Sequence, residues 1–278
     1  MQKNLSSDLT RSLELASEIL HAHAPVMIAY SGGVDSSVLL ALTHRCLGEK
    51  ALGVIADSPS LPRQALREAL AQAERIGARV EILNTQEMQN SDYAANPINR
   101  CYFCKAELFQ SMDALARSRE FSAIAYGENA DDPAATRPGA VAAREFSVLA
   151  PLKSAGIGKA AVRELAQQWN LSSAELPAAP CLSSRIPYGT PVTSEALTLI
   201  EKAEESLKNF GFRILRVRYK LLVDPANKIS QQHGANVQVA PAELPYAQAR
   251  QSQIIACLRS LGFSEVEIDP LGYQGSLA

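Results

Sequence analysis

The sequence predicts an α/β protein with a doubly wound parallel sheet over residues 1–180 and a smaller α+β domain over residues 181–278. Two observations lead to this fold class. Short apolar segments alternate with helical segments as far as residue 169, which is typical of a parallel sheet covered by helices on both faces. After residue 172 the chain becomes rich in Pro, Ser and Gly, as in a linker, before helix and strand patterns resume.

The elements of the first domain follow from apolar periodicity. The first helix is expected to bury one face, formed by Leu9, Leu13, Ala16 and Leu20. Later helices are predicted over residues 37–47, 62–77, about 104–117 and 158–169. Strands are predicted over residues 26–30, 51–57, 79–84, 121–127 and 147–152. Ligands of such sheets bind beyond the carboxyl ends of the strands, where the polar motifs of this chain fall.

The second domain is predicted to be a small α+β unit with two related halves. A helix that ends in Gly211 is followed by a strand over residues 213–223, and a second strand covers residues 235–240. A helix over residues 242–263 then leads into a strand over residues 264–269. The sequence pattern helix–Gly-Phe–strand therefore occurs twice.

Composition excludes several classes of protein. The chain has 278 residues, of which 47% are hydrophobic and 20% are charged, as in globular proteins and unlike disordered chains. A net charge of -2 argues against a non-specific nucleic-acid binder. No apolar run approaches the ~20 residues that cross a bilayer, and the N-terminus lacks the features of a signal peptide. We therefore expect a cytoplasmic protein without membrane contacts.

A glycine- and serine-rich loop joins the first predicted strand to a helix, with the sequence Ser31-Gly32-Gly33-Val34-Asp35-Ser36-Ser37. Two glycines allow a sharp turn and a close approach of the backbone to a ligand, and the N-terminus of a helix attracts anions. The hydroxyl groups add hydrogen-bond donors, and a carboxylate beside phosphates is explained by a bridging Mg²⁺ ion. The loop is therefore predicted to bind phosphates. The structural alternative is a glycine turn with a serine as helix cap.

Further polar residues follow the second and fourth predicted strands. Asp57 ends the second strand, and the segment from Gly127 to Asp132 follows the fourth, with Arg137 beyond it. Carboxylates and an arginine at this edge suit Mg²⁺ and phosphate binding. The alternative is a solvated turn.

The chain has five cysteines, an odd number that does not indicate a disulfide framework. Cys46 and Cys257 lie in apolar helical segments and are expected in the core. Cys101, Cys104 and Cys181 could contribute to a zinc site, a redox dithiol or an iron–sulfur cluster. Three cysteines without a second CxxC match a 4Fe-4S cluster with one open iron better than a structural zinc site. A Cys101–Cys104 disulfide or free thiols are the structural alternatives.

Arg216 and Arg218 alternate onto one face of a predicted strand in the second domain. Both could therefore hold one phosphate group, since arginine binds phosphate through a planar fork of donors. The alternative is a solvated strand face.

Together these motifs resemble the PP-loop ATP pyrophosphatases, which cleave ATP between its α and β phosphates. Within that superfamily, RCYFCK, RPG and CLSSRIPYGTPVT resemble the LarE family of ATP-dependent sulfur transferases. The resemblance implies a sheet order 3-2-1-4-5, ATP and Mg²⁺ as cofactors, and trimers or hexamers. It also implies a nucleotide contact at Asp57 and substrate contacts at Ser184, Arg185, Arg216 and Arg218.

The resemblance further implies the reaction. A carboxylate of a pyridinium mononucleotide is adenylylated and converted to a thiocarboxylate in nickel-pincer nucleotide synthesis. In one form of the family the residue at position 181 gives up its own sulfur. In the other, Cys101, Cys104 and Cys181 would hold a 4Fe-4S cluster that carries an extra sulfide, and this chain is similar to that form.

Two features depart from the family pattern. The chain inserts LLVDPANKISQQ after the arginine strand, and it has Asn236 and Gln238 where an Arg and a Glu are usual. A different acceptor substrate is therefore open. Two other functions also remain open: a PP-loop tRNA thiolase, which the acidic composition disfavours, and a non-catalytic adenine-nucleotide-binding protein with a redox-sensitive cysteine site.

Overall fold

The computed structural model describes residues 5–133, 137–176, 180–222 and 232–273, and it divides the chain into two units. The first unit contains Met1–Glu87 and Asn99–Ala179, and the second contains Met88–Ile98 and Pro180–Ala278. Residues 88–98 group with the second unit, whereas the sequence-based division at residue 180 placed them in the first domain.

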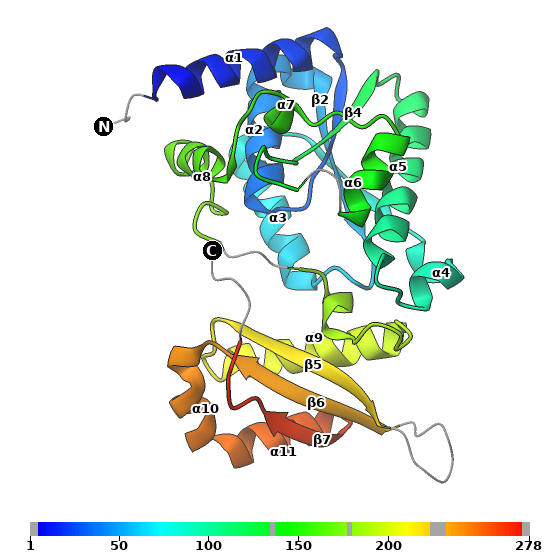
Figure 1. Ribbon diagram of the computed structural model, residues 1–278, viewed down its shortest axis with the longest axis vertical. Helices are drawn as coiled ribbons and strands as arrows, with labels where there is room; N and C mark the ends of the chain where they lie inside the picture. Colours follow the sequence, from blue (N-terminus) through cyan, green and yellow to red (C-terminus); the bar gives the residue numbers. More distant parts are fainter. Residues whose placement is uncertain (1–4, 134–136, 177–179, 223–231, 274–278) are drawn as a thin grey trace. The chain divides into compact units, whose positions relative to one another are not determined.

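The first unit is built on a parallel sheet with the strand order β3-β2-β1-β4 (Figure 1). Its strands are β1 (Val26–Ala29), β2 (Ala51–Asp57), β3 (Val80–Asn84) and β4 (Ala123–Tyr126). This confirms the predicted α/β class. The fifth strand, predicted over residues 147–152, is wrong in extent: a single parallel bridge joins Leu149 to Ala125, and a short helix, α7 (Pro151–Ser154), follows. Pro151 has no N–H for a sheet ladder and sits at the start of that helix.

Helices cover both faces of this sheet, as Figure 1 shows. They are α1 (Ser7–Ala22), α2 (Val34–Leu47), α3 (Arg63–Ile76), α5 (Arg100–Ser118), α6 (Pro138–Glu145) and α8 (Lys159–Gln168). All four residues of β1 are buried because alternate side chains enter two different cores. Val26 and Ile28 pack in the core that α1, α2 and α8 share, and Met27 packs with α5 and α6.

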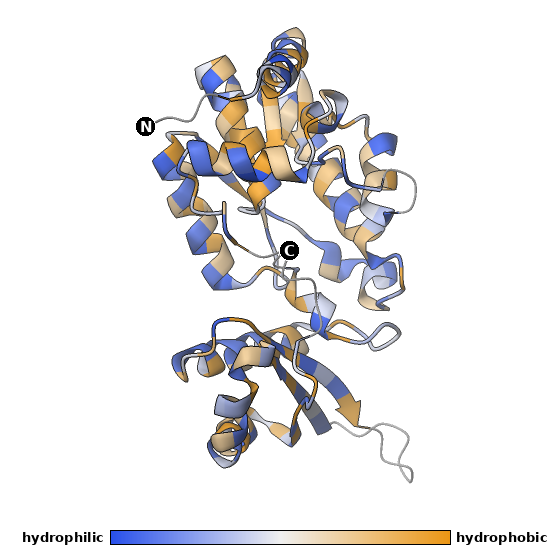
Figure 2. Ribbon diagram, turned by 60° about the vertical axis from the view of Figure 1, so that its left-hand side comes forward, coloured by the Kyte–Doolittle hydropathy of each residue, from blue (hydrophilic) through white to orange (hydrophobic). Residues whose placement is uncertain are grey.

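The second unit contains a three-stranded sheet in the order β5-β6-β7. Its strands are β5 (Leu215–Leu222), β6 (Gln232–Val239) and β7 (Phe263–Ile268), and its helices are α4 (Ser91–Ala94), α9 (Ser194–Asn209), α10 (Leu244–Ala249) and α11 (Gln251–Leu261). β5 and β6 are antiparallel, whereas β6 and β7 are parallel. Figure 2 shows the alternation of hydrophobic and polar residues along these strands, which matches a sheet with one buried face.

Three predicted helices have clearly different bounds in the structure. α2 begins at Val34 rather than at residue 37. α5 begins at Arg100 rather than near residue 104, so Cys101 and Cys104 lie inside its first turns. The helix predicted over residues 242–263 is divided at Arg250 into α10 and α11. The insertion after β5 falls largely on residues 223–231, outside the described residues. Within the part of the chain that is described, no helix is long and apolar enough to cross a membrane.

Candidate functional site

The phosphate loop connects β1 to α2 through a turn that requires glycine. Gly32 has a φ of +76°, and a Cβ atom placed there would lie 2.7 Å from the Cβ of Ala69 in α3. Both the left-handed backbone and the lack of space exclude other residues at this position. The backbone conformation and the close contact with α3 therefore explain why the sequence has glycine at position 32.

The serine hydroxyls of the loop are partly used within the fold. Ser36 Oγ donates to the carbonyl oxygen of Gly33 at 3.0 Å and accepts from the amide of Ser31 at 3.2 Å. Ser37 is fully buried, and its Oγ accepts a hydrogen bond from Gln72 of α3. Ser31 and Ser36 stand at the loop itself, whereas Ser37 ties α2 to α3, so its phosphate contact stays a prediction.

The N-terminus of α2 has no side-chain cap. Its N-cap residue is Gly33, not a serine, so the capping alternative does not explain this loop. The first N–H groups of a helix lack internal acceptors and attract anions. Gly127, at the end of β4, approaches this turn so closely that a Cβ atom there would lie 2.7 Å from the backbone nitrogen of Ser36. The end of β4 and the start of α2 therefore pack tightly against each other.

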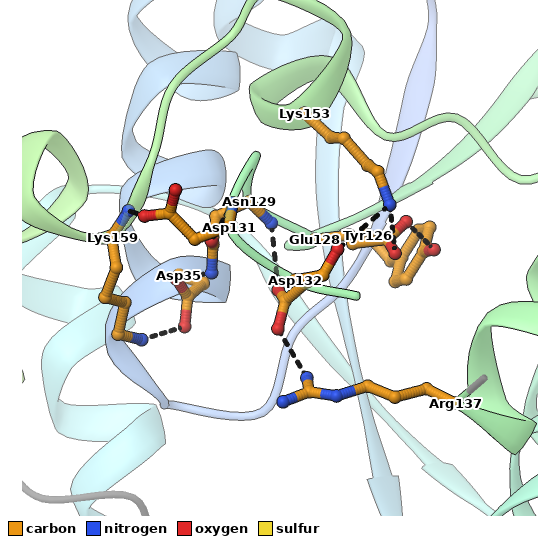
Figure 3. Close-up of polar contacts among 9 residues, drawn as sticks. All are labelled: Asp35, Tyr126, Glu128, Asn129, Asp131, Asp132, Arg137, Lys153 and Lys159. Atoms are coloured by element: carbon orange, nitrogen blue, oxygen red, sulfur yellow. Dashed lines mark hydrogen bonds and ion pairs between the residues drawn. The ribbon is translucent and has the colours of Figure 1, made fainter. Parts of the chain in front are cut away.

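Asp35 is held by two residues that follow β4 and begin α8 (Figure 3). Asn129 Nδ2 donates to Asp35 Oδ1 at 3.0 Å, and Lys159 Nζ lies 2.5 Å from Asp35 Oδ2. Asp131 accepts the backbone N–H of Lys159 at 2.6 Å and so caps α8. The carboxylate of Asp35 thus stands beside the phosphate loop with a cation already against it.

Two side chains donate hydrogen bonds to the carboxylate of Glu128 (Figure 3). Lys153 Nζ donates to Glu128 Oε1 at 2.7 Å, and the hydroxyl of Tyr126 donates to Glu128 Oε2. Burial and the hydrogen bond to Glu128 raise the pKa of Tyr126 above its ordinary value, so this hydroxyl remains a donor at neutral pH. Asp132 pairs with Arg137 at 2.5 Å, as shown in the same view.

These contacts pair each of three carboxylates with a cation of the chain: Asp35 with Lys159, Glu128 with Lys153, and Asp132 with Arg137. The described residues contain no group of three or more His, Cys, Asp or Glu side chains placed to hold a metal ion. Mg²⁺ in nucleotide sites usually takes only one or two carboxylates and completes its shell with phosphates and water. The free protein therefore need not contain a complete metal site to use Mg²⁺ with ATP.

Sequence reasoning missed both lysines of this site. Lys159 occupies the first position of α8, where the helix dipole disfavours a cation. A lysine at such a position after the fifth predicted strand was the signal available, because a nearby anion offsets the unfavourable interaction with the dipole, which is about 0.3–1 kcal/mol. Lys153, at the end of α7, gave no comparable signal.

Asp57 ends β2, as predicted, and pairs with Arg63 at 2.6 Å. Arg63 lies at the start of α3 and also donates to the carbonyl oxygens of Ser58 and Leu61. The loop after β2 is thus held in place by Arg63. The predicted nucleotide contact of Asp57 is not tested by this arrangement.

The three candidate cysteines are distributed over the two units. Cys101 and Cys104 lie three residues apart in the first turns of α5, in the first unit, and Cys181 precedes a 3-10 turn (Leu182–Arg185) in the second. All three are free thiols; Cys101 and Cys181 are exposed and Cys104 is half-buried. The structure therefore does not show the predicted Cys101–Cys104 disulfide alternative.

Arg185 is buried and binds the turn that follows Cys181. Its Nε and NH2 groups bind the two oxygens of Glu204 at 2.8 and 3.0 Å, a bidentate ion pair. Its NH1 group donates to the carbonyl oxygens of Pro180 and Cys181 and to Ser184 Oγ. Sequence reasoning did not identify Glu204, and the predicted substrate contacts of Ser184 and Arg185 stay predictions.

Arg216 and Arg218 share the face of β5 opposite the buried Leu215 and Val217. Arg218 donates to Ser184 O at 2.7 Å and to Gln238 Oε1 at 3.1 Å, which are both neutral acceptors. Burial, and then the nearby Arg185, lower the pKa of Arg216, whose guanidinium lies 5.0 Å from the ring centre of Tyr273. A partly desolvated pair of guanidinium groups of this kind favours an anionic ligand.

The two residues that depart from the family pattern are tied to Asp269, which follows β7. Gln238 Nε2 and Asn236 Nδ2 both donate to Asp269 Oδ2, at 2.9 and 3.3 Å. The hydrogen bond from Gln238 is the main cause that lowers the pKa of Asp269. Gln238 therefore links the carboxylate of Asp269 to the guanidinium of Arg218 through a neutral amide.

Comparisons with known proteins agree with the loop and the fold. A family model described as NAD synthase matches residues 9–131. An uncharacterised Synechocystis protein is 38% identical over 250 residues, which cover 89% of both chains. The pyridinium-3,5-bisthiocarboxylic acid mononucleotide synthase of Lactiplantibacillus plantarum is 28% identical over 90% of this chain and 87% of that protein. An uncharacterised Methanocaldococcus jannaschii protein is 29% identical over 71% of this chain and 75% of that protein.

Proposed function

Because the chain belongs to the PP-loop superfamily, in one family with the Synechocystis relative, we propose that it is an ATP-dependent sulfur transferase. Its acceptor would be a carboxylate of a pyridinium mononucleotide, as the name of the Lactiplantibacillus relative suggests. The observation that carries the proposal is the uncapped N-terminus of α2, with Asp35 and Lys159 beside it. The similarity to the Lactiplantibacillus relative extends through the second unit, where Cys181 and the arginine strand lie.

ATP would bind with its phosphates at the loop from Ser31 to Ser36. The N–H groups of the loop and Lys159 would offset the phosphate charge, and Asp35 would face the Mg²⁺ ion that ATP brings. Glu128 and Asp132 are two further carboxylates at this strand end that could join the metal shell. We assign Arg137 to the departing pyrophosphate, since its guanidinium is largely exposed and already directed at Asp132.

The reaction follows from leaving-group chemistry. A carboxylate oxygen of the acceptor attacks the α-phosphorus, pyrophosphate leaves, and an acyl-adenylate forms. A sulfur nucleophile then attacks the acyl carbon, and AMP leaves with the electron pair of the broken C–O bond. A thiolate is a good nucleophile near neutral pH, so an exposed cysteine can perform the second step.

Cys181 is the residue to which we assign sulfur transfer, because it is exposed at a turn held by a buried ion pair. If it gives its own sulfur, its thiolate first forms a thioester with the acyl group as AMP leaves. A base then removes the Cα proton, the Cα=Cβ double bond forms, and the Cβ–Sγ bond breaks with its electron pair on sulfur, so that the thiocarboxylate leaves dehydroalanine at position 181. Cys101 and Cys104 are chemically suited, with Cys181, to ligate a 4Fe-4S cluster, whose open iron would supply an exchangeable sulfide. The described residues show no assembled group of three such ligands.

The phosphate of the acceptor would bind to Arg216 and Arg218. Arg218 donates to two neutral acceptors, Gln238 Oε1 and Ser184 O, and Arg216 is partly buried on the same face of β5. Asn236 and Gln238 replace an Arg and a Glu, so this face lacks one positive and one negative charge of the family pattern. The acceptor would differ accordingly in the groups that contact these two positions.

The test is product formation by Cys181→Ala, with Cys257→Ala as the matched control. The chain, purified without oxygen, is incubated with Mg²⁺, ATP and a pyridinium carboxylate mononucleotide, and AMP, pyrophosphate and thiocarboxylate are quantified. We expect Cys181→Ala to bind ATP normally and to form no thiocarboxylate, while Cys257→Ala matches the wild type. Thiocarboxylate formation by Cys181→Ala at the wild-type rate would refute the assigned role.

Iron and acid-labile sulfide analysis of the same sample decides the source of the sulfur. Stoichiometric iron that is lost in Cys101→Ala supports a cluster. A protein without iron that loses the mass of one H₂S during turnover supports sacrifice of Cys181.

A further inference from the structure

The segment that carries Cys181 occupies the open edge of the second sheet. Among the described residues, β5 is the edge strand of this sheet and pairs with β6 on one side. On its other side, the backbone N–H of Val217 donates to Glu204 Oε1 at 3.1 Å, and the side chain of Arg218 donates to Ser184 O at 2.7 Å. The carboxylate of Glu204 thus accepts a backbone N–H that a further strand could otherwise bind, and the turn after Cys181 is bound beside it through Arg218.

Glu204 binds two different parts of the second unit at once. Its Oε1 accepts from both Arg185 Nε and the backbone of Val217, and its Oε2 accepts from Arg185 NH2. The side chains of Arg185 and Glu204 are only 3% and 9% exposed. Because Arg185 also binds the carbonyl oxygens of Pro180 and Cys181, hydrogen bonds run without interruption from β5 to Cys181.

The energetics of such a pair indicate a geometric role. Burying two charges costs several kcal/mol, and their attraction often only offsets that cost. Apolar residues of similar size would stabilise a fold about as well, but they cannot hold two carbonyl oxygens and a strand edge in one register. The pair therefore contributes directional contacts that packing alone would not supply.

We propose that Arg185 and Glu204 form a positioning clamp that fixes the Cys181 turn against β5. The clamp sets the distance between the thiol of Cys181 and the guanidinium of Arg218, which binds the same turn through Ser184 O. This inference rests on the proposed function for the role of the thiol. It assigns Arg185 to positioning rather than to direct contact with the acceptor.

The first test replaces the clamp with apolar residues, Arg185→Met with Glu204→Leu, so that no buried charge is left unpaired. We expect the variant to fold with a lower melting temperature than the wild type, because the buried amide of Val217 loses its acceptor. We expect hydrogen exchange of the amides of Ser184 and Ile186, which bond within the turn, to rise at least tenfold. The rate of thiolation should fall about 100-fold, the loss expected for a reacting group misplaced by about 1 Å, while ATP binding and pyrophosphate release are unchanged.

The matched control is the double variant Lys220→Gln with Glu267→Gln, which removes an exposed ion pair on the same sheet. It should change neither the exchange of the Cys181 turn nor the rate. Arg185→Lys serves as a second variant, because it keeps the charge opposite Glu204 but cannot bind both carboxylate oxygens and two carbonyls. We expect it to fold and to lose at least tenfold in thiolation rate.

Unchanged exchange at the Cys181 turn in the apolar double variant would overturn the clamp, as would a thiolation rate within threefold of the wild type. The exchange measurement needs no turnover. A wild-type chain without sulfur transfer would thus refute the proposed function while the clamp is judged on exchange alone.

Discussion

Gly127→Ala tests whether the tight packing of the end of β4 against the start of α2 is needed for stability and for ATP binding. A Cβ atom at this position would lie 2.7 Å from Ser36 N, 2.8 Å from the carbonyl carbon of Asp35 and 2.9 Å from Ser36 Cα. All three neighbours are backbone atoms, so no side chain can rotate away. Ordinary contact begins near 3.4 Å, so the strand end or the helix start must move by about 0.7 Å.

The movement has two measurable consequences. Overpacking of this kind costs about 1–3 kcal/mol, which corresponds to a lower melting temperature by roughly 2–12 °C for a unit of this size. Because Asp35 and Ser36 form the start of the phosphate site, ATP affinity and pyrophosphate release should fall by about 10- to 100-fold. Calorimetric titration with ATP and Mg²⁺, together with a pyrophosphate assay, measures both.

Gly139→Ala is the matched control. Gly139 lies within α6, and its added Cβ would approach the Lys105 side chain at 3.2 Å and the carbonyl oxygen of Cys101 at 3.9 Å, an ordinary contact. Replacing a helical glycine with alanine stabilises by about 0.5–1 kcal/mol, so this variant should be as stable as the wild type or more so, with unchanged ATP affinity. If Gly127→Ala bound ATP as tightly as Gly139→Ala does, the assignment of the phosphate site to this turn would be refuted.

Three further outcomes are expected. Lys159→Ala should weaken ATP binding about tenfold, measured by calorimetric titration, because it removes a cation beside the phosphates; its stability should change by less than about 1 kcal/mol, as for exposed ion pairs. Equal affinity for ATP would exclude Lys159 from the site. Asp269→Asn should lower the free energy of unfolding at neutral pH, because the folded state lowers the pKa of this carboxyl. That stabilisation exists above the ordinary pKa near 4 and is lost as pH falls through the folded-state pKa, so urea titrations of variant and wild type should converge in acid. Arg218→Gln should raise the KM for a phosphorylated acceptor more than it lowers kcat, and it should leave the KM for ATP unchanged.

Local signals predicted the first four strands, and the family resemblance supplied their order, which the sheet β3-β2-β1-β4 matches. β1 and β2 have short apolar cores bounded by turn residues, and such segments are recognised without knowledge of their neighbours. The segment over residues 147–152 shows the same apolar pattern, yet it forms one bridge at Leu149. Pro151 stops the ladder there, and whether an apolar segment pairs depends on the backbone beside it.

The candidate site likewise contains residues that the local sequence pattern predicts and residues that it does not. The glycines and serines of the phosphate loop were predicted because their roles are set by the local turn, as the positive φ of Gly32 shows. Lys159 was missed because its partner, Asp35, lies 124 positions away along the chain. The buried Glu204 was missed for a similar reason, since an isolated glutamate in a helix normally faces solvent.

The sequence by itself determined the α/β class, the phosphate loop and the family resemblance, because these depend on short-range periodicity and on residues with special backbone freedom. Only the tertiary structure decided which charges neutralise one another and how the Cys181 turn is held. Ion pairs and hydrogen bonds act over about 3 Å, and the fold alone brings such distant residues within that distance. The roles of Lys159, Arg185 and Glu204 therefore follow from the three-dimensional arrangement of the described residues.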